Sequence, residues 1–223
     1  MDGNRDPDQT LVRLCQDPDG EGFEVAFEAL YQRYRDRVYS IAFRIVGSAA
    51  DARDVVQEGF SLLFRKIGTF RFDSLFSTWL FRLVVNCAID HKRQRKNRPN
   101  SHRGTPARSG TEFAESEEPA DPATISPFEV AASAELGEHV HHCLQKLSPK
   151  LRAILVLRYL ESMSYEQLAD TLGLAMGTVK SRLARAHLAI ENVLRGTLAP
   201  FGFAEMAAPG SGKPLTVSEE GVA

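Results

Sequence analysis

The stretch from Ser164 to Ala189 carries residue types that contact DNA. Hydroxyl and basic side chains share one side of an expected helix, and they are Thr178, Lys180, Ser181, Arg182 and Arg185. Apolar residues recur between them at intervals of three and four, so we expect the apolar side to face inward. Basic and hydroxyl groups on one helix face are suited to contact phosphates and base edges in a major groove.

The residues in front of this helix predict a helix-turn-helix. Ser164 and Gln167 have the spacing of a capping box, which starts a first helix. Gly173 supplies the left-handed residue that ends it, and the second helix is expected to begin near Met176. The pattern is a fold signal first, because similar helix pairs occur in proteins that never touch DNA.

A second constellation lies between Asp51 and Lys96. Acidic and amide side chains gather on one helix side, at Asp51, Asp54, Gln57 and Glu58. Five aromatic residues then crowd residues 70–81, and basic residues follow. Rings that stack on bases beside cations that track a backbone are typical of a single-stranded nucleic-acid site. Asn86 and Asp90, one helical turn apart, could bond exposed base edges. A structural alternative places the rings in a core and leaves the charges solvated.

Helical periodicity without a convincing strand pattern predicts an all-α fold with two small helical domains. Besides the helix-turn-helix, the expected helices are Phe23–Val46, Ala50–Ile67, Ser74–Lys96, Glu135–Leu147 and Ser148–Leu160, the last with Pro149 at its first position. The expected division is an N-terminal extension (1–22), a first domain (23–97), a flexible polar linker (98–134), a helix-turn-helix domain (135–196) and a disordered tail (197–223).

Charge supports the position of the linker. Seven Lys and Arg residues and no acidic residue lie from His91 to Thr111, whereas seven acidic residues and no basic one lie from Glu112 to Glu135. The acidic block from Glu112 to Asp121 could mimic nucleic acid, and the alternative is a solvated tether.

Composition excludes several classes of protein. The 223 residues are 43% hydrophobic with a net charge of -2, which suits two small cores. Without a long apolar segment, we expect a cytoplasmic protein with no membrane insertion. Three separated cysteines argue against a disulfide framework.

No phosphate loop, nucleophile motif or acid-base pair is present, so we expect neither an enzyme nor a cofactor. His139, His142 and Cys143 have zinc-ligand spacing without a second cluster, and we expect no metal.

Three strings together resemble the bacterial RNA polymerase sigma factors of the extracytoplasmic-function (ECF) type. They are DARDVVQEGF, STWLFRLVVNCAIDHKRQ and SYEQLADTLGLAMGTVKSRLARA, which occur in this order with a polar linker before the third. The resemblance implies a subunit that brings core RNA polymerase to promoters. Its first domain would melt the minus-ten element, and its second would bind the minus-thirty-five element as duplex. It also implies an anti-sigma partner.

The resemblance also implies a role for individual residues. Contacts with the beta-prime coiled coil fall to Asp51, Asp54, Gln57, Glu58 and Phe60. The minus-ten element falls to Phe70, Phe72, Ser74, Phe76, Trp79, Arg82, Asn86, Asp90 and Arg93. The minus-thirty-five element falls to Arg158, Thr178, Lys180, Ser181, Arg182 and Arg185. Ala184 and Lys180 depart from residues common in the family, a bulky aromatic and an arginine. Lysine at position 180 keeps the charge but lacks the two-pronged contact that arginine makes with guanine.

Two other functions remain open at this stage. A stand-alone helix-turn-helix regulator would bind duplex DNA without core polymerase. A single-strand RNA-binding protein would bind with no need for duplex sequence. The partners that the resemblance implies are core RNA polymerase, through its beta-prime and beta subunits, and promoter DNA in duplex and single-stranded form.

Overall fold

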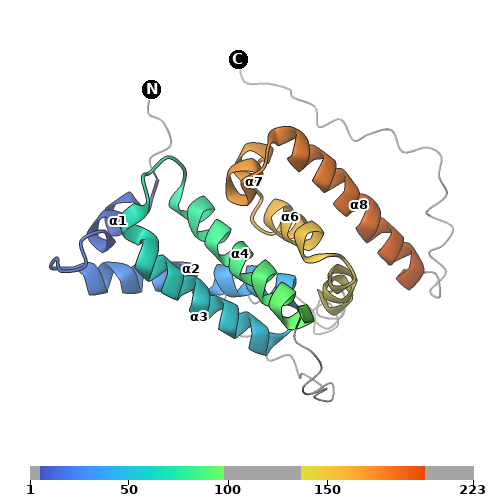
Figure 1. Cartoon of the computed structure of the whole chain (residues 1–223), viewed down its shortest axis with the longest axis horizontal. Helices are drawn as coiled ribbons and strands as arrows, with labels where there is room; N and C mark the ends of the chain where they lie inside the picture. The colour runs from blue at the N-terminus through green and yellow to red at the C-terminus, as the bar shows by residue number, and fades with distance from the viewer. Residues whose placement is uncertain (1–5, 98–136, 199–223) are drawn as a thin grey trace, which may run out of the picture.

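A computed structural model describes residues 6–97 and 137–198, and it is helical throughout the described part (Figure 1). The elements are α1 (Gln9–Cys15), α2 (Phe23–Val46), α3 (Ala49–Lys66), the 3-10 turn η1 (Ile67–Thr69), α4 (Phe76–Asn97), a helical segment over residues 137–145, α6 (Pro149–Tyr159), α7 (Tyr165–Leu172) and α8 (Met176–Leu198). The all-α expectation is confirmed. The acidic block and nearly all of the predicted linker and tail lie outside the described residues.

Three long helices form the first domain, and each packs against the other two. Their buried faces follow the predicted three- and four-residue spacing. The largest fully buried side chains of this core include Leu30, Ile41, Ile45, Leu63, Phe76, Leu80 and Phe81. Ser48 caps the start of α3 by accepting a hydrogen bond from the backbone N–H of Asp51. Gly47, in the left-handed conformation, ends α2 and turns the chain into α3.

The first domain begins earlier than the sequence predicts. Helix α1 lies within the stretch assigned to an N-terminal extension, yet it packs against α2 and buries Val12 and Cys15 completely or nearly so. Asp8 is buried as well, and its carboxylate accepts hydrogen bonds from Arg33 and Tyr34 of α2. Residues 6–16 are therefore part of the first domain.

The second domain is built around α6, which packs against α7 and α8. Its residues 153–157 are buried on all sides, which explains the uninterrupted aliphatic run at these positions. The sequence predicts two separate hydrophobic cores, one in each domain, and the structure differs from this prediction. Helix α2 packs against α6, and α4 packs against both α6 and α7, so one hydrophobic cluster runs through both domains (Figure 1).

Three side chains bond carbonyls in the last turn of α2, and two of them come from the second domain. The pairs are Lys92 Nζ with Val46 O at 2.8 Å, Gln145 Nε2 with Arg44 O at 3.0 Å, and the Arg152 guanidinium with Ile45 O. These carbonyls have no partner within their own helix, so each needs one from elsewhere.

Arg152 bonds carbonyl oxygens of both domains at their interface. Its side chain is buried, and burial lowers the pKa of the guanidinium to about 10. Besides Ile45 O it donates to the carbonyl oxygens of Leu144 (2.8 Å), Gln145 (2.8 Å) and Leu147 (2.9 Å). One guanidinium thus caps the ends of two helices, one from each domain.

An imidazole and an ion pair complete the interface. The His141 ring stacks on Phe43 of α2, with 4.4 Å between ring centroids. Arg37 of α2 pairs with Glu161, which follows α6. Burial lowers the pKa of His141, and the nearby positive charges of Arg44 and Arg152 act in the same direction, while a hydrogen bond with the backbone of Gly47 opposes them.

Arg152→Met should destabilise the domain interface. At least two buried carbonyls would lose their partner, at a cost of about 1 to 3 kcal/mol each. We therefore expect a free energy of unfolding about 2 to 6 kcal/mol lower, measured by urea denaturation. The same substitution at exposed Arg195, which only pairs with Glu191 one turn away, is the control and should change it by less than about 0.5 kcal/mol. Equal stability of both variants would contradict the assigned role of Arg152.

Acid should weaken the same interface through His141. In an unfolded chain a histidine takes up its proton near pH 6.5, whereas the packed ring does so only at lower pH. The stabilisation is complete above pH 6.5 and is lost as the pH falls through the lowered pKa. We expect His141→Phe to flatten the pH dependence of the melting temperature between pH 7 and 5. His139→Gln, at an exposed position of the same helical segment, should leave it as in the wild type.

Candidate nucleic-acid interface

Helix α8 has the two faces that the sequence predicts. Val179, Leu183 and Ala186 are buried against the rest of the second domain. The opposite side carries Lys180, Ser181 and Arg185, which are exposed, and Thr178 and Arg182, which are partly exposed. Hydrogen bonds of Ser181 Oγ to Thr178 O and of Arg185 Nε to Ser181 O keep these side chains close to the helix, at 3.1 and 3.3 Å. This face is free to enter a major groove.

The helix-turn-helix is confirmed in its details. Ser164 accepts from the backbone N–H of Gln167 at 3.2 Å, and the Gln167 side chain accepts from the N–H of Ser164 at 2.8 Å. Gly173 ends α7 with a φ of 61°, a left-handed conformation that suits glycine. The pKa of Glu166 is lowered by a backbone N–H at this helix start and by the Ser164 hydroxyl.

Arg158 has a different position from the other predicted duplex contacts. Its guanidinium donates to the carbonyl of Met163 and lies over the ring of Tyr165, 5.4 Å from the centroid. It therefore braces the turn between α6 and α7. A contact with DNA would use only the part of this side chain that remains exposed.

A polar stripe follows the exposed side of α4. Arg82, Asn86, Asp90 and Arg93 are exposed at intervals of three and four residues, so they share one face. Arg93 lies 3.8 Å from Asp90 in a loose ion pair. This α4 ridge offers hydrogen-bond donors, acceptors and positive charge, which suit the bases and phosphates of an unpaired DNA strand. The start of this ridge meets the second domain, because Arg82 lies against Gly173 at the end of α7.

The aromatic residues just before α4 and in its first turns are more buried than the single-strand prediction requires. Phe70, Phe76 and Phe81 belong to the core, so direct contact with a base from Phe70 or Phe76 is not supported. Phe72 and Trp79 are partly exposed, and Ser74 is partly exposed beside them. The rings of Phe70 and Trp79 pack with 5.2 Å between centroids, and those of Phe70 and Phe72 with 4.9 Å. The structural alternative thus holds for the buried rings, and a stacking surface is left at Phe72 and Trp79.

The α3 residues predicted to contact polymerase are also partly buried and partly exposed. Asp54, Gln57 and Glu58 are exposed. Asp51 is buried and paired with Arg95 of α4, and Phe60 packs on Tyr31 of α2 with 4.7 Å between ring centroids. We therefore restrict the predicted protein contact to the three exposed side chains and assign Asp51 and Phe60 a structural role.

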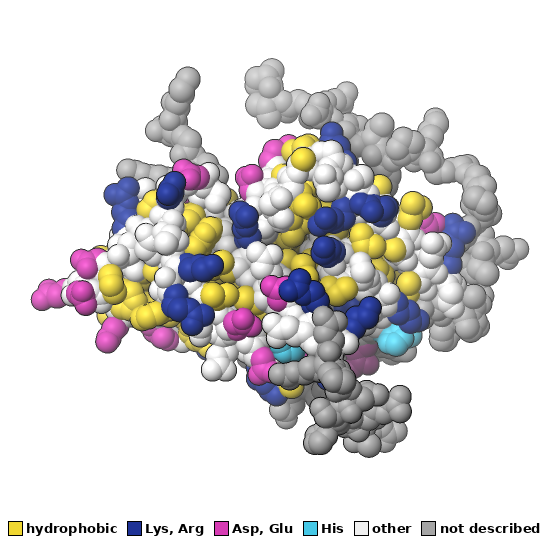
Figure 2. All heavy atoms as spheres, viewed as in Figure 1, with side chains coloured by type: hydrophobic (Ala, Val, Ile, Leu, Met, Phe, Trp, Pro, Cys, Tyr) yellow, Lys and Arg dark blue, Asp and Glu magenta, His cyan; other side chains and the backbone are white. Residues whose placement is uncertain are grey.

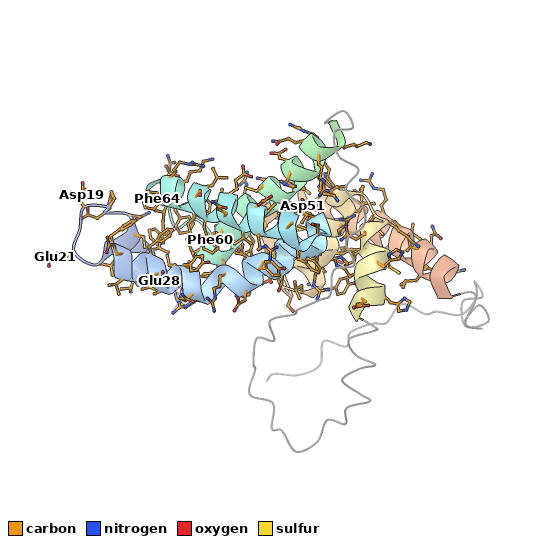
Figure 3. All side chains as sticks on the ribbon, turned by 90° about the horizontal axis from the view of Figure 1, so that it is seen from below. Asp19, Glu21, Glu28, Asp51, Phe60 and Phe64 are labelled. Carbon is orange, nitrogen blue, oxygen red and sulfur yellow. The ribbon has the colours of Figure 1, made fainter. Side chains whose placement is uncertain are left out.

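Phe64, which lies one turn beyond Phe60 on α3, is exposed but is not among the predicted site residues. Figure 3 shows Phe64 near the turn between α1 and α2 that carries Asp19 and Glu21. Its side chain is 55% exposed and packs edge-on against Phe23 and Phe27, with centroids 5.6 and 5.7 Å away. This exposed ring lies two helical turns beyond Gln57 on the same side of α3, so it extends the candidate protein-binding face. In the sequence, Phe64 falls at the spacing of the apolar side of this helix, with Phe60 and Leu63, so the pattern gave no sign that its ring is exposed.

The zinc-ligand spacing of His139, His142 and Cys143 does not produce a site. Cys143 is buried in the second domain, while both histidines are exposed. Among the described residues, the one group of three close donors is Asp51, Asp54 and His91, and Arg95 already supplies a positive charge to Asp51. Burial raises the pKa of the Cys15 and Cys87 thiols to about 11, which makes both unreactive. Cys87 is buried as expected.

Basic side chains spread over α4 and the helix-turn-helix on the face shown in Figure 2, while acidic ones gather where α1 meets α2. A nearly neutral average charge therefore hides a basic face. Within the residues that the structure describes, no helix is both long and apolar enough to cross a membrane.

Fold and surface together define a DNA-binding protein with a helix-turn-helix in one domain and a second polar helix face in the other. Comparison with known families agrees: residues 30–98 match the family model for sigma-70 region 2, and residues 138–190 match that for sigma-70 region 4. The first match runs from within α2 to the end of α4, and the second from the helical segment 137–145 to within α8.

Individual relatives make the assignment more specific. The RNA polymerase sigma-H factor of Pseudomonas aeruginosa is 36% identical over 87% of this chain and 97% of its own length. The ECF sigma-E factor of Escherichia coli K12 is 35% identical over 83% and 93%, and the ECF factor SigW of Bacillus subtilis 30% identical over 78% and 92%. The chain belongs to the ECF family of RNA polymerase sigma factors, which are transcription initiation factors and not enzymes.

Solved structures share the fold. CnrH, solved in complex with the cytosolic domain of CnrY, has a TM-score of 0.58 at 25% identity and covers 85% of this chain and 97% of its own. The sigma factor RpoE of Bartonella quintana, solved with the anti-sigma factor NepR, has a TM-score of 0.53 at 21% identity, over 76% and 96%.

Proposed function

We propose that this sigma factor directs core RNA polymerase to promoters through three separate surfaces. The exposed α3 face with Asp54, Gln57 and Glu58 docks on the beta-prime coiled coil, and Phe64 extends that contact. The α8 face binds the minus-thirty-five element as duplex. The α4 ridge, with Phe72 and Trp79, captures the unpaired minus-ten strand. We assign the second domain a further contact with the beta subunit.

The α4 ridge carries the greatest weight in this proposal. A stand-alone regulator needs only the helix-turn-helix, whereas the exposed series from Arg82 to Arg93 beside half-exposed rings suits a single strand. A protein that holds both duplex and single strand must act where DNA is opened. Extrusion of a base costs a few kcal/mol, and stacking with hydrogen bonds to the base edge offsets that cost.

The packed domains cannot occupy both promoter elements at once. The elements lie about 25 base pairs apart, or about 85 Å at 3.4 Å per step. In the structure α7, the first helix of the helix-turn-helix, touches α4, so the two DNA-binding domains are packed together. Residues 98–136 connect the domains, and a segment of that length can reach about 130 Å when extended. We therefore propose that the domains separate when the polymerase complex forms.

A cognate anti-sigma factor is a further part of the proposal. CnrH, which shares this fold, was solved with the cytosolic domain of CnrY bound, and such a partner would act here by holding the domains in an inactive arrangement. Recovery of the tagged chain from its host with no protein partner other than polymerase would contradict this part.

The function is tested by run-off transcription with purified core polymerase on genomic fragments. We expect initiation from a small set of promoters only when this protein is present. Asp54→Arg should weaken binding to core polymerase by about tenfold or more, because it puts a positive charge where an acidic face docks. Affinity is measured by fluorescence titration of labelled sigma factor.

The matched control is Asp36→Arg, an equal charge reversal at an exposed position of α2. It should leave core affinity and initiation unchanged. If the protein adds no initiation and yet binds a specific duplex unaided, the stand-alone regulator is correct and the α3 and α4 assignments fall. Binding to single-stranded RNA alone would favour the third interpretation.

A further inference from the structure

The loop over residues 70–75, between η1 and α4, is held from outside by the N-terminal segment 6–16. Gln16, which follows α1, donates two hydrogen bonds from its side-chain amide to this region. The acceptors are Phe70 O at 2.7 Å and Ile67 O at 3.1 Å. Both bonds reach across more than fifty residues of sequence, so they fix the start of the loop relative to α1.

The middle of the loop is held in an unusual conformation. Phe72 has a φ of 60°, in the left-handed region that a bulky residue rarely adopts. Such a conformation persists only where its surroundings enforce it. Arg13 of α1 lies over the Phe72 ring, 5.6 Å from its centroid, and the Phe70 ring packs against the same ring at a tilt. A second residue from the same segment thus supports the exposed ring of the loop.

The far end of the loop is tied to the same segment. The Asp6 carboxylate accepts a hydrogen bond of 2.6 Å from the backbone N–H of Phe76, the first residue of α4. That N–H has no acceptor within its own helix. Asp8, two residues later, is anchored to Arg33 and Tyr34 of α2. Start, middle and end of the loop therefore each contact one rigidly placed stretch of eleven residues.

We propose that segment 6–16 is a clasp that sets the geometry of loop 70–75 for capture of an unpaired base, with Gln16 as its main positioning residue. The inference rests on the proposed minus-ten role of Phe72 and Trp79. Stacking and edge recognition need the receiving groups held to a fraction of an ångström before the base arrives. Gln16 itself acts through its hydrogen bonds to the carbonyls of Ile67 and Phe70.

The test compares full-length Gln16→Leu with wild type, each assembled with core polymerase on a duplex promoter. Stopped-flow fluorescence of a promoter base separates closed-complex affinity from the rate of opening. We expect opening to slow by about tenfold, the equivalent of about 1.4 kcal/mol for two lost hydrogen bonds, with core and closed-complex affinity within twofold. On a promoter with a pre-melted minus-ten element, the defect in opening should largely disappear.

Two further variants sharpen the result. Gln16→Glu keeps the length of the side chain but replaces its donor by a carboxylate that faces carbonyls, so it should be at least as slow. Gln32→Leu makes the same replacement at an exposed glutamine of α2 whose side chain bonds Glu28, one turn away, and it should open promoters at the wild-type rate. An unchanged opening rate in Gln16→Leu, or a parallel loss of core affinity, would overturn the positioning role.

A second readout does not depend on polymerase. Trp79 is the single tryptophan of the chain and packs on Phe70, so its emission reports the geometry of the loop. In isolated, folded Gln16→Leu we expect emission shifted to longer wavelength, and in Gln32→Leu no shift. If wild-type protein fails to open any promoter, the proposed function falls, while a shifted Trp79 spectrum would still support the clasp. An unshifted spectrum would remove it.

Discussion

The end of helix α2 imposes the constraint on which the arrangement of the two domains depends. A helix leaves its last carbonyls without partners, and when they are buried they must find donors elsewhere. Here the carbonyls of Arg44 and Ile45 receive them from Gln145 and Arg152 in the second domain. The same guanidinium caps the helical segment 137–145, so separation of the domains exposes polar groups on both sides.

That interface suits a protein with two states. Carbonyls that lose a protein donor can bond to water, so the cost of opening is moderated, whereas the shared apolar cluster favours closure. A partner that binds either domain in its open form shifts the equilibrium by its difference in affinity for the two forms. Under our proposal, the two domains bind promoter elements that lie about 85 Å apart. Binding to core polymerase and promoter therefore favours the open form.

Local sequence signals predicted the bounds of the longer helices well. They failed for residues whose burial depends on contacts with residues far away in the sequence. The bounds of α2 and the capping box at Ser164 follow from periodicity and cap chemistry within a few residues. Helix α1 was missed, although Leu11, Val12 and Cys15 have helical spacing, because a seven-residue helix carries a weak signal. The roles of Asp51, Phe60 and Phe76 could not be inferred, since their burial depends on Arg95, Tyr31 and other residues far away in sequence.

The central claim is that closed domains must separate on the promoter, and a distance between spin labels tests it most directly. Labels at Arg35→Cys in α2 and Asn192→Cys in α8 lie at exposed positions outside the proposed binding surfaces, and all three native cysteines are buried. We predict one short distance in the free protein and a distance longer by tens of ångströms once core polymerase and promoter are bound. A transcriptionally active complex that keeps the short distance would contradict the account.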